Sequence, residues 1–156
     1  MKIRFWAICS FTLLATTWFA QNGPEDASKV IQGTWRLALI YKTPNVQGPS
    51  ETEQKQLLNT ILIYTVQQLK SCDQAVPITS LQEHRVTASD FLASTHVRFT
   101  QVKIDGPDIP EVIINERRSG SCLGVFPLPG QDIYIKGKNE LLIYFEGVFY
   151  RALRVR

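Results

Sequence analysis

Turn residues interrupt this chain at short intervals, and the segments between them alternate apolar with polar side chains. The C-terminal part shows this best: residues 131–136, 140–145 and 148–155 are three such segments, separated only by turns at 137–139 and 146–147. Alternation with a period of two is typical of β-strands that have one buried face. Because connections this short join antiparallel neighbours, the pattern predicts an all-β, mainly antiparallel fold.

Further segments of this kind occupy most of the chain. The segment 33–41 alternates so that four large side chains share one face: Trp35, Leu37, Leu39 and Tyr41. Residues 61–66 are rich in β-branched and aromatic side chains and favour a strand, although a helix that continues to Leu69 is an alternative. Shorter predicted strands are residues 81–86, 95–104, 111–118 and 122–126.

One short helix is predicted among these strands. Ser50 is a suitable N-cap, and Glu51 and Glu53 follow it in the first turn, so residues 51–58 are expected to be helical. About eight strands and one short helix predict a β-barrel or a sandwich, and a closed barrel would leave no exposed strand edges. Residues 21–156 are sufficient for one such domain.

The first 20 residues have the pattern of a secretory signal peptide. Lys2 and Arg4 precede an apolar run that is too short to span a bilayer comfortably. Cleavage is expected after Ala20, but Trp18 is bulkier than the small residue usual before a cleavage site, so an uncleaved anchor is the alternative. No other segment is apolar over the length of a transmembrane helix. We therefore expect a secreted or periplasmic protein without stable membrane insertion after cleavage.

Export changes the expected state of the cysteines. Cys9 lies in the leader, and only Cys72 and Cys122 remain beyond it. Two cysteines in an oxidising compartment allow one intramolecular pairing, so a Cys72–Cys122 disulfide is predicted in preference to two free thiols. A zinc site fits less well, because the cysteines and histidines lack the compact spacing of metal ligands. No metal and no cofactor are expected.

Charge and motif content argue against two large functional classes. Of the 17 Lys and Arg residues, two lie in the leader, which leaves a near balance with the 14 Asp and Glu residues. The densest basic clusters are Arg117 with Arg118 and three arginines at the C-terminus, unlike the basic stripe of a nucleic-acid-binding protein. His84 and His96 lie in no nucleophile or metal motif, and no phosphate-binding or dinucleotide-binding fingerprint occurs. We expect neither nucleic-acid binding nor catalysis.

Residues 26–35, DASKVIQGTW, resemble the opening of lipocalins, in which a short helical turn precedes a first strand with a G-x-W motif. Gly33 and Trp35 match this motif, and the ending NELLIYFEGVFYRALRV resembles the last hairpin of small bacterial lipocalin-like domains. The resemblance covers both ends of the chain. It implies an eight-stranded up-and-down barrel in which an Arg or Lys of the last strand packs on the Trp. We expect Arg151 rather than Arg154 in this role, because Arg151 interrupts an otherwise apolar face and a guanidinium is stabilised over an indole.

The resemblance also implies a function. A barrel of this kind can hold a small hydrophobic molecule, and the expected ligand-lining residues are Leu39, Tyr41, Phe99, Tyr134, Ile143, Phe145 and Phe149. The same side chains could instead fill the interior as core. The expected function is that of an exported carrier or scavenger. The alternative is a small secreted β-domain that binds another protein through a disulfide-anchored loop at 122–129, which would present Val125, Phe126 and Leu128.

Overall fold

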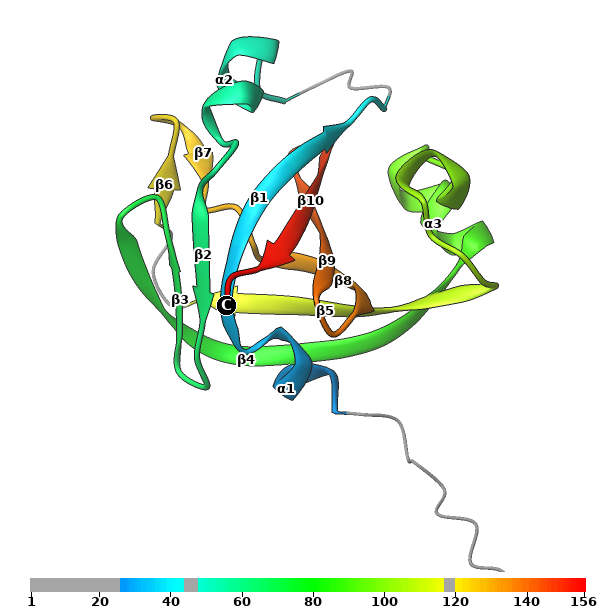
Figure 1. The fold of residues 1–156 in the computed structure, drawn as a ribbon, viewed down its shortest axis with the longest axis horizontal. Coiled ribbons are helices and arrows are strands. Elements are labelled where there is room, and N and C mark those ends of the chain that lie inside the picture. Colours follow the sequence, from blue (N-terminus) through cyan, green and yellow to red (C-terminus); the bar gives the residue numbers. More distant parts are fainter. Residues whose placement is uncertain (1–25, 44–47, 117–119) are drawn as a thin grey trace, which may run out of the picture.

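The computed structural model describes residues 26–43, 48–116 and 120–156. Eight antiparallel strands close into a barrel in the order β1-β10-β9-β8-β5-β4-β3-β2 (Figure 1). The all-β, mainly antiparallel class and the eight-stranded barrel are therefore confirmed. The strands of the barrel are β1 (Gly33–Tyr41), β2 (Ile61–Tyr64), β3 (Gln68–Ser71), β4 (Gln74–Thr87), β5 (Asp108–Glu116), β8 (Asp132–Gly137), β9 (Glu140–Phe145) and β10 (Val148–Arg154).

Short helices and one hairpin complete the described part of the chain. They are α1 (Ala27–Ile31), α2 (Glu51–Gln56), α3 (Ala88–Thr95), the 3-10 helix η1 (Phe99–Val102) and the hairpin of β6 (Ser121–Cys122) with β7 (Phe126–Pro127). The helix predicted over 51–58 is confirmed as α2. Its N-cap Ser50 and its Glu53 bond to one another reciprocally, as a capping box does. The predicted signal peptide, residues 1–20, lies outside the described residues, as do Arg117 and Arg118.

Two predicted strands are wrong. Residues 95–104 do not form a strand but the end of α3, a connection and η1. The helix α3 begins after Thr87, whose hydroxyl accepts a hydrogen bond from the backbone N–H of Asp90. Residues 122–126 do not join the barrel either, because β6 and β7 pair only with each other in a separate two-stranded sheet.

The buried side chains form two cores, one on each side of the barrel wall. The interior core takes residues from all eight barrel strands, among them Ile133, Leu141, Ile143 and Tyr150. The outer core takes the alternate residues Tyr134, Leu142 and Phe149, together with Phe91 of α3 and Phe99 of η1. Because alternate strand residues point to opposite faces, the outer core lies on the outside of the barrel. The long strands β4 and β5 run beyond the barrel and carry α3 there (Figure 1).

A β-bulge in β1 reverses the faces that regular alternation predicts. The pairing with β10 shifts between Leu37 and Leu39, so that Leu37 lies opposite Ala152 but Leu39 lies opposite Arg151. One extra residue in a strand exchanges its inward and outward faces from that point on. Trp35 and Leu37 therefore point inward as predicted, whereas Leu39, which is 43% exposed, and Tyr41 point outward.

The predicted Cys72–Cys122 disulfide is present. The two sulfur atoms are 2.00 Å apart. The bond joins the turn between β3 and β4 to strand β6, and so ties the separate hairpin to the barrel. Among the described residues, no helix has both the length and the apolar character needed to cross a membrane.

Candidate functional site

One end of the barrel is closed by α1, Trp35 and Arg154. Trp35 is fully buried, and its indole N–H donates to the carbonyl oxygen of Ile31 at 2.7 Å. The guanidinium carbon of Arg154 lies 4.1 Å from the centre of the Trp35 ring. Gly33 has a φ of +124°, which favours glycine, and a Cβ there would lie 2.6 Å from Nη1 of Arg154, so a side chain at this position would displace the guanidinium. The G-x-W motif is thus structural, and the cation that covers its Trp is Arg154.

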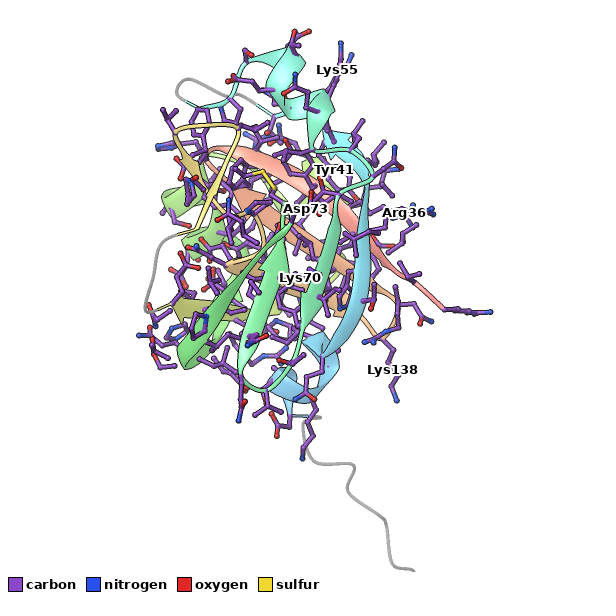
Figure 2. The ribbon with its side chains drawn as sticks, turned by 90° about the vertical axis from the view of Figure 1, so that its left-hand side faces the viewer. Arg36, Tyr41, Lys55, Lys70, Asp73 and Lys138 are labelled. Carbon is purple, nitrogen blue, oxygen red and sulfur yellow. A yellow bond between two sulfur atoms is a disulfide. The ribbon has the colours of Figure 1, made fainter. Side chains whose placement is uncertain are left out.

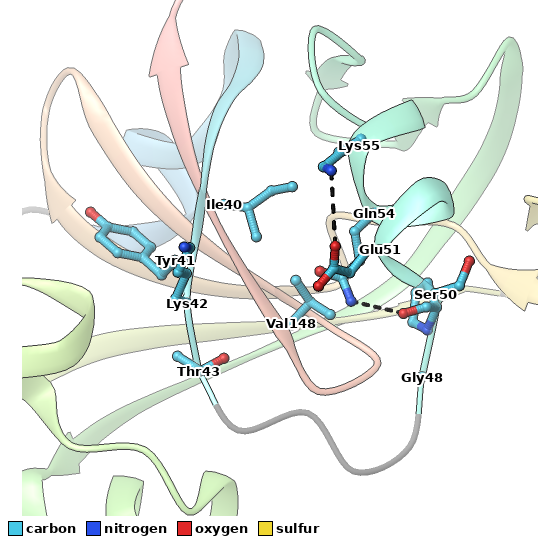
Figure 3. Close-up of a pocket in the computed structure, with 11 residues that line it drawn as sticks. Ile40, Tyr41, Lys42, Thr43, Gly48, Ser50, Glu51, Gln54, Lys55 and Val148 are labelled. Carbon is cyan, nitrogen blue, oxygen red and sulfur yellow. Dashed lines mark hydrogen bonds and ion pairs between the residues drawn. The ribbon is translucent and has the colours of Figure 1, made fainter.

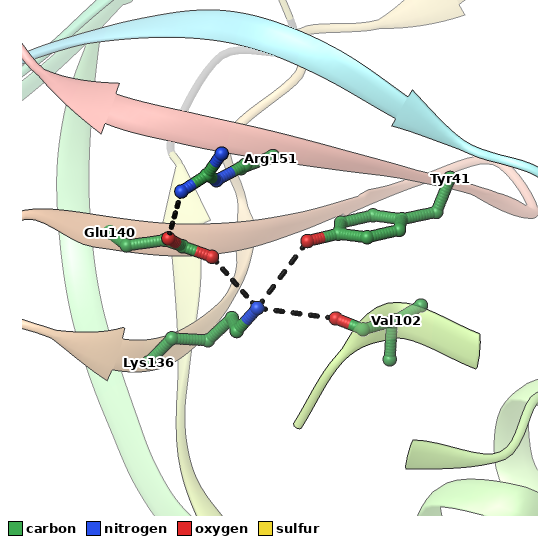
Figure 4. A network of polar contacts seen from close by, with 5 residues as sticks. All are labelled: Tyr41, Val102, Lys136, Glu140 and Arg151. Atoms are coloured by element: carbon green, nitrogen blue, oxygen red, sulfur yellow. Dashed lines mark hydrogen bonds and ion pairs between the residues drawn. The ribbon is translucent and has the colours of Figure 1, made fainter. Parts of the chain in front are cut away.

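The expectation that Arg151 covers Trp35 is therefore wrong. Arg151 lies on the outer face of β10 and donates to Oε2 of Glu140 at 2.6 Å. The other oxygen of Glu140 is 2.7 Å from Nζ of Lys136, which also donates to the Tyr41 hydroxyl and the Val102 carbonyl, each at 3.3 Å (Figure 4). These hydrogen bonds to Arg151 and Lys136 hold the pKa of Glu140 below its ordinary value despite its burial. We call this set the ionic network; it fastens η1 to the barrel wall.

The seven expected ligand-lining residues do not meet in one pocket. Ile143 and Phe145 lie in the interior core, and Leu39 is exposed on the outer face. Tyr41, Phe99, Tyr134 and Phe149 belong to the outer core beneath α3, where Phe91 contacts the rings of Phe99, Tyr134 and Phe149 at centroid distances of 5.0, 5.1 and 5.3 Å. Their assignment to a common inward face is wrong: the bulge turns Leu39 and Tyr41 outward, and Phe99 lies in η1. Tyr134 and Phe149 lie on the outward faces of β8 and β10.

Side chains occupy the inside of the barrel. Trp35, Tyr64 and Tyr150 are the largest of the fully buried residues there. The Tyr64 hydroxyl donates to the carbonyl oxygen of Gly130 at 3.0 Å, and burial raises its pKa far above the ordinary value. A small barrel filled in this way is a packed core rather than a chamber.

An open cleft lies at the rim of the barrel, at the end opposite α1. It has a volume of about 810 Å³ and lies between α2 on one side and the paired end of β1 and start of β10 on the other (Figure 3). Ile40 and Val148 provide an apolar floor, whereas the ring of Tyr41 points to the other side of β1, toward the outer core. We call this the rim cleft. Its described lining residues are Ile40, Tyr41, Lys42, Thr43, Gly48, Pro49, Ser50, Glu51, Gln54, Lys55 and Val148.

Hydrogen bonds hold α2, which forms one wall of the rim cleft, in place. The Tyr150 hydroxyl reaches the backbone carbonyl of Gln54 at 3.3 Å, which holds α2 against the barrel. The Gln54 side chain donates to the carbonyl oxygen of Pro49 at 2.8 Å. The bulge in β1 turns Ile40 toward the cleft. In the pairing of β1 with β10, Ile40 lies opposite Tyr150. Regular alternation conceals this orientation, which is why sequence reasoning missed Ile40.

The polar groups of the rim cleft include two lysines and a glutamate. Lys55 lies 3.9 Å from Glu51 on α2, and Lys42 has no hydrogen-bond or ion-pair partner among the described residues. His84 on β4 and His96 at the end of α3 are both exposed and do not line the cleft. Within the described ranges, no group of three or more metal-ligating side chains comes together. The cleft combines an apolar floor with a cation at its edge.

The outer wall also holds a pair of carboxyl groups that sequence reasoning did not single out. Asp132 of β8 is half-buried close to Glu111 of β5, and its buried oxygen, Oδ1, has no hydrogen-bond partner within the described structure. Burial, and secondarily the negative charge of Glu111, raises the pKa of Asp132 to about 6. The same surroundings raise the pKa of the neighbouring Tyr134 far above its ordinary value.

The loop at 122–129 does not present its large apolar side chains as the protein-binding hypothesis assumed. Leu128 is 1% exposed and belongs to the interior core, and Phe126 is half-buried with its ring 6.2 Å from that of Phe145. Val125, at the tip, is 87% exposed. The expected presentation is therefore wrong for Phe126 and Leu128 and correct for Val125 alone.

A comparison of the chain with protein-family models, with curated proteins and with solved structures found no match.

Proposed function

We propose that this chain is an exported lipocalin-like protein that binds a small amphiphilic molecule in the rim cleft rather than inside the barrel. The observation that carries the proposal is the open volume of about 810 Å³ over an apolar floor, beside a barrel whose interior is occupied by its own side chains. A site of this size suits a small molecule. The disulfide supports export, because such bonds persist in oxidising compartments.

The chemistry of the cleft indicates the form of the molecule. Ile40 and Val148 would contact its apolar part, and burial of that part supplies affinity in proportion to the area covered. Lys42 stands at the edge without an intramolecular partner in the described structure, so it is available to an anionic head group. A chain with a terminal carboxylate, such as a fatty acid, meets both requirements.

Titration calorimetry with dodecanoate tests the proposal. We expect saturable binding, about tenfold weaker in Ile40→Ser because apolar contact of roughly 1.4 kcal/mol is lost. Ile63→Ser is the matched control, since Ile63 is equally half-buried but lies on the outer face of β2 away from the cleft. Lys42→Glu should weaken dodecanoate and leave dodecanol unaffected. Absence of saturable binding, or an equal loss in both serine variants, would refute the proposal.

Tryptophan fluorescence is not a suitable readout for this experiment. Trp35 is fully buried at the closed end, beneath Arg154. Five residues of strand, or about 16 Å, separate it from Ile40. Its emission is therefore expected to stay constant while the rim cleft fills.

A further inference from the structure

The outer surface of the barrel is divided into a covered half and an uncovered half. The segment α3–η1 covers β5, β8, β9 and the first part of β10, where it forms the outer core. The ionic network of Lys136, Glu140 and Arg151 lies at the edge of the surface that α3–η1 covers. Beyond this edge, no other described segment covers the outward side chains of β3, β2, β1 and the second part of β10. We call this surface the bare wall.

Apolar side chains remain exposed on the bare wall. Ile61 of β2 is 41% exposed and Leu39 of β1 is 43% exposed, while Ile63 and Leu153 are half-buried. The register places Ile61 and Leu153 on either side of Arg36. Residues directly opposite in an antiparallel sheet share a face at about 5 Å. A shallow groove of about 310 Å³, lined in part by Ile61, Ile63 and Lys70, opens on the same surface.

Cations without partners stand among these apolar residues. Arg36 lies between Ile61 and Leu153, and Lys70 of β3 lies opposite Ile63. Both are exposed, and neither forms a hydrogen bond or an ion pair with any described side chain. Figure 2 views this side of the molecule and shows both cations projecting from the strands.

Few carboxylates oppose these cations. Glu140, which lies opposite Leu153, is already bonded to Lys136 and Arg151. Asp73 lies at the turn between β3 and β4, at the edge of the groove. The bare wall therefore combines exposed aliphatic side chains with an excess of positive charge.

We infer that the bare wall is a docking surface for an anionic lipid membrane. Aliphatic side chains that enter the head-group region, flanked by Arg and Lys at head-group level, are the features that hold a peripheral protein on acidic lipids. Charge argues against a second copy of this chain, because a symmetric contact would bring Arg36 and Lys70 toward like charges. This inference does not depend on ligand binding in the rim cleft.

Vesicle sedimentation tests the docking surface, with exported protein whose N-terminus has been identified by mass. We expect binding to vesicles of phosphatidylglycerol and phosphatidylcholine at a ratio of about 3:7, little binding to phosphatidylcholine alone, and release when salt rises from about 0.1 M to about 1 M. Arg36→Glu with Lys70→Glu should lower the partition coefficient at least about tenfold. The control, Arg98→Glu with Lys103→Glu, makes the same change of charge on the covered side. An equal loss in the control, or no binding to acidic vesicles, would overturn the inference.

A fluorescent reporter separates contact of the wall from general charge attraction. Ile61→Trp places an indole on the bare wall, and Val125→Trp places one at the exposed tip of the β6–β7 hairpin. Emission of the first variant should shift to shorter wavelength on acidic vesicles, whereas that of the second should stay constant. A shift at Val125 but not at Ile61 would show that another face meets the lipid and would refute the proposal, as would sedimentation of the protein with a purely acidic polypeptide but not with lipid.

Discussion

Arg154 is the residue on which the closed end of the barrel depends. Its guanidinium covers Trp35, and its nitrogens donate to the carbonyl oxygens of Val30 and Gln32 at 2.6 and 2.8 Å and of Lys138 at 2.8 Å. It therefore joins α1, β1 and the turn between β8 and β9. A single side chain with this many directed bonds acts as a clamp.

Removal of this clamp is expected to be costly. Arg154→Ala should lower the free energy of unfolding by about 2–3 kcal/mol, because it removes a cation–π contact and leaves carbonyl groups without donors. Arg151→Ala should cost about 1 kcal/mol or less, since its side chain is 40% exposed and Lys136 still pairs with Glu140. Urea unfolding of both variants gives the comparison. Equal losses would contradict the assignment of Arg154.

Asp132 is expected to destabilise the fold at neutral pH. Its carboxyl titrates at a pKa of about 6 in the fold but near 3.8 when unfolded, so the folded state holds an extra proton between these values and stability falls as pH rises through them. Asp132→Asn should therefore stabilise the protein by roughly 1–2 kcal/mol above pH 7, discounted for partial exposure. Below about pH 4 the difference should vanish. Urea titrations of both proteins at the two pH values measure it; a pH-independent difference would exclude this explanation.

At the level of single residues, sequence reasoning succeeded where the alternation of a strand is uninterrupted. The expected packing of a last-strand cation on Trp35, beside Gly33, is confirmed. Tyr41 was placed on the wrong face, because nothing local in residues 33–41 marks the bulge after Leu37. Arg151 was chosen because its face looked apolar. That face is apolar, but it is the outer one, covered in part by α3–η1.

Among the elements, the segment α3–η1 changes the molecule most. Its sequence contains an N-capping pattern that predicts a helix and that the strand assignment did not take into account. Thr87 is followed three residues later by Asp90, and the two residues bond to one another at the helix N-terminus. The aromatic Phe99 suggested a strand, but it packs on the outer wall from a 3-10 turn. Long-range packing decided the conformation of this segment, and one sequence does not display such contacts.

Phe91 should hold this segment in place. It is fully buried among Phe99, Tyr134 and Phe149, so Phe91→Ala is expected to cost about 3–4 kcal/mol. Hydrogen exchange should quicken in residues 88–104 and stay slow in β2 and β3, which lie on the other side of the barrel. Leu92→Ala, at a position that is 42% exposed, is the control. Uniform acceleration throughout the barrel would mean that the segment and the barrel unfold as one unit.

For the molecule as a whole, the disulfide is the main covalent restraint. It closes a loop with a sequence separation of 50 residues. Chain entropy predicts a loss of up to about 4 kcal/mol in Cys72→Ser with Cys122→Ser. Reduction of the native protein should produce the same loss in urea unfolding. If the reduced protein and the double variant differ markedly, packing of the serines rather than loss of the bond determines the result.

The pairing of the first barrel strand with the last has a consequence for how the protein forms. Trp35 lies opposite Arg154, so the ring is sealed by residues almost as distant in sequence as this domain allows. Contacts between such distant residues slow folding, because the intervening chain must first be ordered. Until β10 has been synthesised, β1 and β9 each lack a neighbour, and the nascent chain has no completed barrel. During synthesis the chain therefore cannot complete its barrel until the last strand has been made. An incompletely folded chain is also the form in which polypeptides are threaded across membranes.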